Sequence, residues 1–237
     1  MPALLTLRAA GDMRRDGPGR AAYYRSTGIN PEDVWVVGQT HSRTAVVVSP
    51  PQTGARVADE VCPDQRTAIG EHFTPSADGM VTADPGLILG VTVADCMPIF
   101  LADPVTGARG LLHSGWRGTG ILARAVQMMT ERFGSRAGDL LVTMGPCISA
   151  ESYEVDEQRA LEFAREWGPA AVRRSASRVC LDLRAANQEI CRRCGVSSVN
   201  VVEHCTAAES SLASYRRDGA GYTLMLALLG ERLGEIN

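Results

Sequence analysis

The sequence predicts an α/β or α+β fold, because strand-like and helix-like segments alternate along most of the chain. Short β-branched or apolar runs lie between turn residues, and amphipathic stretches with helical spacing follow several of them. A hydrophobic fraction of 45% and a charged fraction of 22% exclude a disordered or fibrous chain. At about 150 residues per domain, 237 residues make one large domain or two small ones. No linker or repeat divides them, so we expect one domain over residues 1–237.

Strands are expected wherever an apolar or β-branched run meets a turn signal. In chain order these runs are Val34–Val37, Thr44–Val48, Leu87–Val93, Met97–Leu101, Gly110–His113, Leu140–Met144 and Val199–Val202. Residues 49–79 begin and end with stretches that contain proline and glycine, and we expect an irregular excursion there. A loop of this length inside a compact domain is usually functional or mobile.

Helices are expected where apolar residues recur with helical spacing between recognisable end signals. In chain order they are residues 121–133, the stretch from Asp156 to Trp167, the stretch from Asp182 to Cys194, and the apolar segment Tyr222–Leu233. Gly134 ends the first of them, and Asp156 and Asp182 are candidate N-caps. The segment Tyr222–Leu233 is expected to be the final helix.

Charge and composition exclude several partners and sites. The chain has 24 basic and 27 acidic residues, a formal net charge of −3, and no block of like charges. We therefore expect neither a nucleic acid nor a membrane as partner. All 24 basic residues are arginine, which excludes any lysine-based chemistry. No apolar run approaches the roughly 18 residues that a membrane span needs, and Met1–Leu5 is too brief for a signal peptide. Seven cysteines, an odd number, favour free thiols in a reducing cytoplasm.

Three candidate metal ligands lie at or beside predicted strand ends. They are His41, Cys96 and His113. Side chains at strand ends are held rigidly and face loop-lined clefts. Zinc accepts histidine and cysteine, and three protein ligands leave the fourth position for a water whose pKa falls to roughly 7. Separately, each residue would more often be a hydrogen-bonded histidine or a small buried cysteine.

The segment after His113 is a candidate anion site. It contains Gly115, Gly118 and Gly120, follows a strand and leads into the helix predicted from Ile121. Such a turn presents backbone N–H groups to an anion, and Arg117 adds a planar guanidinium. The alternative is a tight turn with a solvated arginine. The spacing matches no nucleotide-binding fingerprint.

Other polar residues carry two interpretations each. Asp95 and Glu154 are candidate general acids or bases, or else caps and turn residues. The segment Tyr215–Gly219, which contains Arg216, is an anion-binding loop or an ordinary charged turn. Cys191 and Cys194 form a C-x-x-C pair that could join His204 and Cys205 in a second zinc site, although two cysteines within a helix are the simpler interpretation.

Taken together, these motifs resemble the bacterial laccase-domain family, whose members are described as multicopper polyphenol oxidases and as purine nucleoside phosphorylases with adenosine deaminase activity. The matching segments, from about Leu5 to the last predicted helix, are Gln39–Ser42, Ala77–Thr82, Val93–Pro98, His113–Gly118, Gly145–Ile148, Tyr153–Val155, Cys205–Thr206 and Ser214–Gly219. Single positions differ from the family pattern, including Val93, Ser114 and Met80. The ordered set is specific, although each piece alone is weak.

The resemblance implies a layered α/β/β/α arrangement with mixed β-sheets in one laccase-domain-like catalytic domain. It also implies that His41, Cys96 and His113 bind one zinc ion, with copper as the alternative metal. The implied enzyme is cytoplasmic and acts on adenosine, inosine, guanosine and methylthioadenosine. Its partners are then a nucleoside and phosphate, with Arg117, Gly118 and Arg216 as the phosphate- or substrate-binding residues.

Two departures from the family pattern bear on the pocket. Family members usually carry a Ser-Thr-Arg-x-Gly-Gly segment near the N-terminus, where this chain has only Leu5–Arg8 and Gly11–Asp12. Residues 219–222 stand where the family often has Gly-Arg. A pocket lined by those residues would be altered here.

Three functions follow as hypotheses. The first is a zinc-dependent purine nucleoside enzyme. The second is a cysteine hydrolase acting on a peptidoglycan precursor, with Cys96 as nucleophile and His113 or His41 as its base. The third is a degenerate member that binds a ligand without turnover. A multicopper oxidase is disfavoured, because four histidines cannot supply several histidine-rich clusters.

Overall fold

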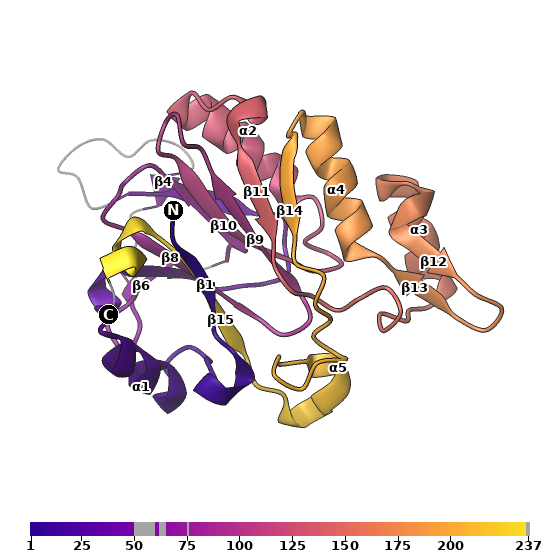
Figure 1. Ribbon diagram of the computed structural model, residues 1–237, viewed down its shortest axis with the longest axis horizontal. Coiled ribbons are helices and arrows are strands. Elements are labelled where there is room, and N and C mark those ends of the chain that lie inside the picture. The colour runs from indigo at the N-terminus through magenta and orange to yellow at the C-terminus, as the bar shows by residue number, and fades with distance from the viewer. Residues whose placement is uncertain (50–59, 62–64, 75, 236–237) are drawn as a thin grey trace.

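Two stacked β-sheets form the centre of the computed structural model, which describes residues 1–49, 60–61, 65–74 and 76–235 (Figure 1). One sheet has the strand order β1-β15-β8-β2-β6-β5, and the other has the order β14-β11-β9-β10-β7-β3-β4. Both contain parallel and antiparallel pairs: β2 pairs parallel with β8, whereas β10 pairs antiparallel with β9. The mixed sheets of the predicted fold class are confirmed.

The first sheet has six strands and the second has seven. The strands of the first are β1 (Ala3–Leu5), β2 (Val34–Val37), β5 (Gln65–Arg66), β6 (His72–Thr74), β8 (Ile88–Val93) and β15 (Met225–Leu229). The strands of the second are β3 (Ala45–Val48), β4 (Glu60–Val61), β7 (Gly79–Thr82), β9 (Met97–Ala102), β10 (Arg109–Ser114), β11 (Leu141–Met144) and β14 (Ser198–Val201). A separate hairpin consists of β12 (Val172–Arg174) and β13 (Val179–Leu181).

Helices cover the outer faces of the two sheets and complete the α/β/β/α layering (Figure 1). They are α1 (Pro18–Thr27), α2 (Ile121–Phe133), α3 (Glu157–Trp167) and α4 (Leu183–Cys194). The short helix α5 (Tyr215–Asp218) has only four residues and does not cover a sheet (Figure 1). Helix α1 packs on the six-stranded sheet, where Tyr24 joins Val34 and Val36 in one cluster. Helices α2, α3 and α4 contribute to the cluster that includes the seven-stranded sheet.

Strand β2 shows how the core is divided between the layers. Val34 and Val36 face α1, whereas Trp35 and Val37 belong to the cluster between the two sheets. Successive side chains point to opposite faces of a strand, so a strand covered on both faces is apolar throughout. Each large side chain that is fully buried here contributes about 1.5–3 kcal/mol relative to an exposed one.

The predicted strands and three of the four predicted helices are confirmed within one or two residues. Asp156 and Asp182 cap α3 and α4 through hydrogen bonds from the backbone N–H groups of Arg159 and Ala185. Among the described residues, no helix is long and apolar enough to cross a membrane.

The predicted helix over Tyr222–Leu233 is wrong. Met225–Leu229 is strand β15, fully buried between β1 and β8, and a short 3₁₀ helix follows at Glu231–Glu235. An apolar run that is buried on both faces lacks alternation, so periodicity cannot distinguish it from a buried helix. Gly230 ends the strand where an added Cβ would lie 2.8 Å from the carbonyl oxygen of Leu87.

Some elements were not predicted. Helix α1 begins with Pro18 at its first position and ends at Gly28 in the left-handed conformation. Part of the excursion predicted over residues 49–79 is regular, because β6 pairs with β2 as a parallel strand. Residues 50–59, 62–64 and 75 of that excursion lie outside the described residues.

Two of the points where the chain passes from the first sheet to the second lie at neighbouring strands. It leaves the first sheet at the ends of β2 and β8 and enters the second at β3 and β9. Because β2 and β8 are parallel neighbours, both crossings occur at the same end of the first sheet. The end of β10 lies beside the start of β9 through the pairing of Ser114 with Met97. These three segments carry the candidate metal ligands.

Candidate metal centre and adjoining cavity

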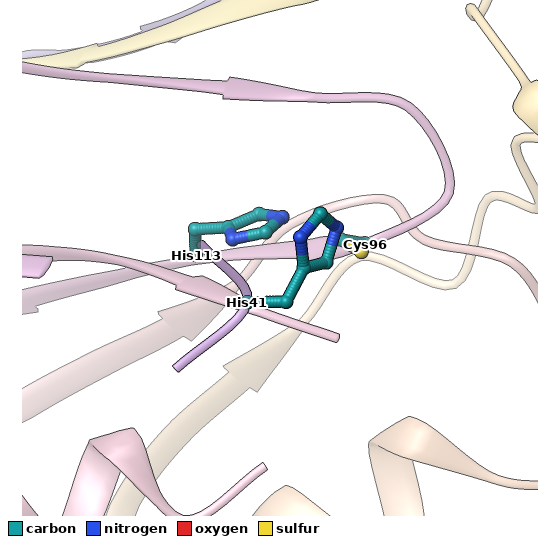
Figure 2. A group of neighbouring side chains, drawn as sticks. All are labelled: His41, Cys96 and His113. Carbon is teal, nitrogen blue, oxygen red and sulfur yellow. The ribbon is translucent and has the colours of Figure 1, made fainter. Parts of the chain in front are cut away.

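His41, Cys96 and His113 converge, as Figure 2 shows, although they come from three separate segments. One ligand atom of each residue lies within 4.8 Å of the others. The two imidazole rings meet edge to face, with 4.9 Å between their centroids. His113 is buried, Cys96 is half-buried and His41 is exposed, so the group opens on one side. The structure thus brings together the three residues that the sequence singled out.

The buried carboxylate of Asp78 organises two of the three ligands. It accepts the backbone N–H groups of Thr40, His41 and Ser42 at 3.1, 3.0 and 2.6 Å. These bonds hold the loop in which His41 adopts a left-handed φ of 60°. Oδ1 of Asp78 also lies 2.8 Å from Nδ1 of His113. An Nδ1–H bonded to this carboxylate leaves Nε2 of His113 as the ligand atom.

Cys96 depends on two unusual backbone positions. Asp95, which precedes it, has a left-handed φ of 77° in the tight turn between β8 and β9. Gly115 faces the sulfur, and an added Cβ there would lie 2.5 Å from Sγ of Cys96. Any larger residue at position 115 would therefore displace the thiol.

The three side chains form an electrostatically coupled group. Burial opposes ionisation of the Cys96 thiol, but the charge of His113 and hydrogen bonds with both imidazoles outweigh it and lower the pKa of Cys96 to about 6. Burial also disfavours a charged His113, but the Cys96 thiolate and the hydrogen bond with Asp78 raise the pKa of His113 to about 9. The pKa of Asp78 is lowered despite its burial, because His113 and Ser42 donate hydrogen bonds to it.

This donor set fits a metal ion such as zinc. Two imidazoles and a cysteine that ionises readily are ligands that zinc accepts, and their number leaves one tetrahedral position open. The Asp78–His113 pair is the carboxylate–histidine arrangement that commonly orients a ligating imidazole. Within the described ranges, no other cluster of three potential ligands occurs.

A cavity of about 830 Å³ adjoins the candidate centre. Polar and aromatic side chains from strand β8, helices α3 and α5 and several loops line it: Gln39, Thr92, Trp116, Tyr153, Arg159, Tyr215 and Tyr222 join the three ligands. Gln39 is fixed by mutual hydrogen bonds with the backbone of Thr92 at 2.8 Å. Burial raises the pKa of Tyr153 to about 12, so its hydroxyl remains a donor at neutral pH. The size and lining suit a small ligand with an aromatic part.

The predicted anion-binding residues occupy different environments. Arg117 and Arg216 line the cavity. The guanidinium of Arg216 donates to the carbonyl oxygens of Ser152 and Glu154, both at 3.0 Å. Gly118 is buried and does not line the cavity; an added Cβ would lie 3.0 Å from the carbonyl oxygen of Ser42.

Some backbone N–H groups of the turn before α2 already donate hydrogen bonds within that turn. The N–H of Thr119 donates to the carbonyl of Gly115, and the N–H of Ile121 donates to that of Gly118. These two donors are therefore unavailable to an anion. Arg117 is the stronger candidate in this segment, because its side chain is exposed and lines the cavity.

Only one of the two candidate carboxylates lines the cavity. Asp95 lines the cavity, and its oxygens accept the hydroxyl of Thr206 at 2.6 Å and the backbone N–H of Arg216 at 2.7 Å. Glu154 is exposed and lies outside the cavity lining.

The C-x-x-C pair does not form a second metal group. Cys191 is buried in the core on helix α4, and Cys194 ends that helix. His204 is exposed and bonds Glu209 at 2.6 Å. Sγ of Cys205 instead accepts the N–H of Ser149 at 3.3 Å.

Several site residues were not assigned a role from the sequence. Asp78 lies inside a recognised motif, but nothing in its neighbours indicates that its carboxylate reaches both the loop at residues 40–42 and His113. Trp116 and Tyr153 lie in motifs as well, whereas Arg159 and Tyr222 carry no local signal. Their contribution depends on tertiary contacts between segments that are far apart in the chain.

Comparisons with known proteins find a matching family model, named relatives and similar solved structures. A family model described as multi-copper polyphenol oxidoreductase laccase matches residues 15–230. Purine nucleoside phosphorylase of Deinococcus radiodurans is 37% identical over 155 residues, which cover 65% of this chain and 60% of that protein. This chain thus spans less than two thirds of that relative's length.

Two further relatives match over a longer region. A purine nucleoside phosphorylase of Corynebacterium glutamicum is 30% identical over 88% of this chain and 81% of its own length. A protein named adenosine deaminase RL5, from an unknown prokaryotic organism, is 32% identical over 81% of this chain and 72% of its own length. Among solved structures, YlmD of Geobacillus stearothermophilus superposes with a TM-score of 0.77 at 26% identity, covering 96% of this chain and 91% of that one.

Proposed function

Because this chain belongs to the multi-copper polyphenol oxidoreductase laccase family, we propose that it is a zinc-dependent purine nucleoside enzyme. The observation that carries the proposal is the convergence of His41, Cys96 and His113 beside a cavity of about 830 Å³. Relatives named purine nucleoside phosphorylase and adenosine deaminase support the substrate class. The proposed reactions are phosphorolysis of adenosine, inosine, guanosine and methylthioadenosine, and deamination of adenosine.

Zinc is the proposed metal and copper the alternative, because imidazole and thiolate suit both. When bound, zinc would supply Lewis acidity and lower the pKa of a water molecule at the site to about 7. His41, Cys96 and His113 would hold it, and Asp78 would orient His113. A multicopper centre requires several histidine-rich groups, and this site has two of the four histidines in the chain.

In the proposed phosphorolysis, a phosphate oxygen bonds to C1′ of the ribose as the bond from C1′ to the purine breaks, and the purine leaves with a proton. Arg117 and Arg216 line the cavity and supply guanidinium donors for the phosphate. Trp116 and Tyr215 offer rings against which the purine packs. Fixing both reactants in one geometry lowers the barrier by positioning.

In the proposed deamination, water adds to C6 of adenine and ammonia leaves. We assign the acid–base role to Asp95 rather than Glu154, because Asp95 lines the cavity and precedes Cys96. Its two oxygens each accept one hydrogen bond and retain a lone pair for a further proton. Tyr153 remains protonated and can donate to a ring nitrogen.

The test is incubation of the purified protein with adenosine, with and without phosphate, beside Cys96→Ala. Adenine that appears only with phosphate indicates phosphorolysis, and inosine indicates deamination. Both products should be lost in Cys96→Ala. Product formation at the wild-type rate by this variant would contradict a role for the centre.

A cysteine hydrolase is a second candidate, and one observation favours it. Cys96, His113 and Asp78 form a chain in which the thiol ionises readily and the carboxylate holds the imidazole at 2.8 Å. This is the arrangement of nucleophile, base and orienting acid that covalent catalysis uses. The proposed substrate class is then a peptidoglycan precursor. A covalent adduct on Cys96 would support this candidate, whereas one bound zinc per chain would exclude a free thiolate.

The proposal also covers compartment and domain organisation. A thiolate ligand needs a reducing environment, so the cytoplasm is the proposed location. The described cysteines are free thiols. We treat residues 1–237 as one catalytic domain, because the metal ligands and cavity lining come from segments throughout it.

A further inference from the structure

A second cavity, of about 410 Å³, adjoins the first and is lined by three arginines. Arg14, Arg15 and Arg20 form one wall together with Asp16, and the ends of β2 and β8 form the other. Gln39, Thr92 and Leu224 line both cavities, so the two spaces are neighbours. None of these three arginines takes part in the proposed reactions.

Arg20 is the most fixed of the three arginines. It is only 2% exposed, and its Nε lies 2.8 Å from the buried Oε1 of Glu71. The hydroxyl of Tyr24 contacts both partners and completes this buried cluster. Within the described part of the chain, the two terminal nitrogens of Arg20 make no hydrogen bond. Arg20 therefore presents a guanidinium in a set position beside the cavity.

Arg14 and Arg15 are held by aromatic rings. The guanidinium carbon of Arg14 lies 4.8 Å from the ring centroid of Tyr222, and NH2 of Arg14 donates to the carbonyl oxygen of Tyr222 at 2.8 Å. The guanidinium carbon of Arg15 lies 4.0 Å from the ring centroid of Phe73. Tyr222 lines the larger cavity, so Arg14 links the two spaces directly. Stacked guanidinium groups lose little freedom when they bind an anion.

Each arginine has one acidic partner, and the cluster is therefore neutral without a ligand. Arg14 pairs with Asp12, Arg15 lies 3.5 Å from Asp16, and Arg20 pairs with Glu71. A guanidinium has five N–H donors, which a single carboxylate contact does not exhaust. Of the acids, only Asp16 lines the cavity, and its Oδ1 already accepts the N–H of Ala68 at 2.6 Å. The lining thus carries three positive groups and one negative group.

We infer that the arginine cavity binds a second phosphate group beside the ligand in the metal-site cavity, distinct from the phosphate that Arg117 and Arg216 would hold during phosphorolysis. Planar guanidinium groups recognise phosphate with paired, charge-assisted hydrogen bonds. The phosphate has two sources: an ester on the 5′ carbon of a nucleoside, or the free ion. The identity of the nucleoside rests on the proposed function, whereas the phosphate site rests on the arginines alone.

The test measures binding rather than turnover. Zinc-loaded protein is titrated calorimetrically, in phosphate-free buffer, with inosine, inosine 5′-monophosphate and inorganic phosphate separately. Inosine is suitable because without phosphate it is neither deaminated nor phosphorolysed. The variant is Arg15→Gln, whose partly exposed side chain can change without opening the core. The control is Arg25→Gln, which removes an exposed arginine from the same region and lines none of the cavities described here.

Wild-type protein should bind the monophosphate about tenfold or more tightly than inosine, because one charge-assisted contact is worth about that factor. Arg15→Gln should remove most of this ratio, and Arg25→Gln should retain it. If the monophosphate binds no more tightly than inosine but Arg15→Gln lowers the affinity for inorganic phosphate, the free ion is the ligand. If Arg15→Gln changes neither affinity, or Arg25→Gln changes them equally, the inference is overturned.

Nucleoside turnover, measured on the same preparations, distinguishes failure of the proposed function from failure of the phosphate site. Turnover of adenosine without any effect of Arg15→Gln on phosphate affinity would leave the proposed function in place and remove the phosphate site. Phosphate binding that depends on Arg15, in a protein that turns over no nucleoside, would keep the phosphate site and remove the proposed function.

Discussion

The buried carboxylate of Asp78 offers the sharpest prediction, because it acts on two candidate metal ligands at once. The substitution Asp78→Asn keeps the size of the side chain but replaces one acceptor oxygen with a donor. That NH₂ group must face backbone N–H groups or Nδ1 of His113, all of which now donate to Asp78. Hydrogen bonds to a charged group are worth about 1.5–3 kcal/mol each, so losing one or two should cost about 1.5–6 kcal/mol of folding free energy.

The effect on the metal should be separate from the effect on stability. Loss of an orienting partner typically lowers metal affinity about 10–100-fold. The assay is competition between metal-free protein and a chromogenic zinc chelator, with urea unfolding of the same samples. Asp103→Asn is a matched control, because Asp103 is equally buried and accepts the N–H of Val105 and Thr106 in a turn at the opposite end of β9.

We expect both variants to lose stability and only Asp78→Asn to lose zinc affinity. Equal zinc affinity in Asp78→Asn and wild-type protein would refute the positioning role of Asp78. A parallel loss in Asp103→Asn would show that general destabilisation, and not orientation of His113, weakens the site.

Three further predictions concern the same centre. Gly115→Ala should lower zinc affinity and nucleoside turnover at least tenfold, because the new Cβ would lie 2.5 Å from Sγ of Cys96. Far-ultraviolet circular dichroism should be unchanged, and full turnover would contradict this packing. In metal-free protein, the rate of iodoacetamide modification of Cys96 should rise through a midpoint near pH 6, since the thiolate is the reactive form and the pKa of Cys96 is lowered to about 6; a midpoint near 9, checked against Cys96→Ala, would show that His113 does not stabilise the thiolate. The stability that Asp78 contributes should be present above the ordinary pKa of 3.8 and decline as pH falls below it, because its folded-state pKa is lowered; acid titration of unfolding should therefore be steeper in wild-type protein than in Asp78→Asn.

Strand β15 shows why one element was predicted wrongly. The sequence around Met225–Leu229 is apolar at every position, and both faces of the strand are buried. Periodicity identifies a helix or a strand only when one face is exposed to solvent. The pairing with β1 and β8, which settles the conformation, joins segments far apart in the chain.

Helix α2 illustrates the opposite case. One face is buried and the other is polar, and Gly134 ends the helix in the left-handed conformation. Both features are local, so the boundaries could be predicted from the sequence. The capped starts of α3 and α4 were predictable for the same reason.

The residues of the candidate site also differ in whether local sequence or contacts between distant segments reveals their role. His41, Cys96 and His113 could be selected because each lies at or beside a predicted strand end within a recognisable motif. Asp78 and Tyr153 could not be assigned roles, because their partners come from other segments. Glu154 resembled Asp95 as a candidate acid, yet only the fold places Asp95 in the cavity lining and Glu154 outside it.

The most direct test of the metal-dependent function is zinc reconstitution of metal-free protein. Zinc is removed with a chelator and returned in steps, and zinc content and adenosine turnover are measured on each sample. Turnover should rise in proportion to bound zinc and stop rising at one ion per chain, with no zinc retained by Cys96→Ala at the same concentration. Undiminished adenosine turnover in the metal-free protein would contradict a metal-dependent nucleoside enzyme.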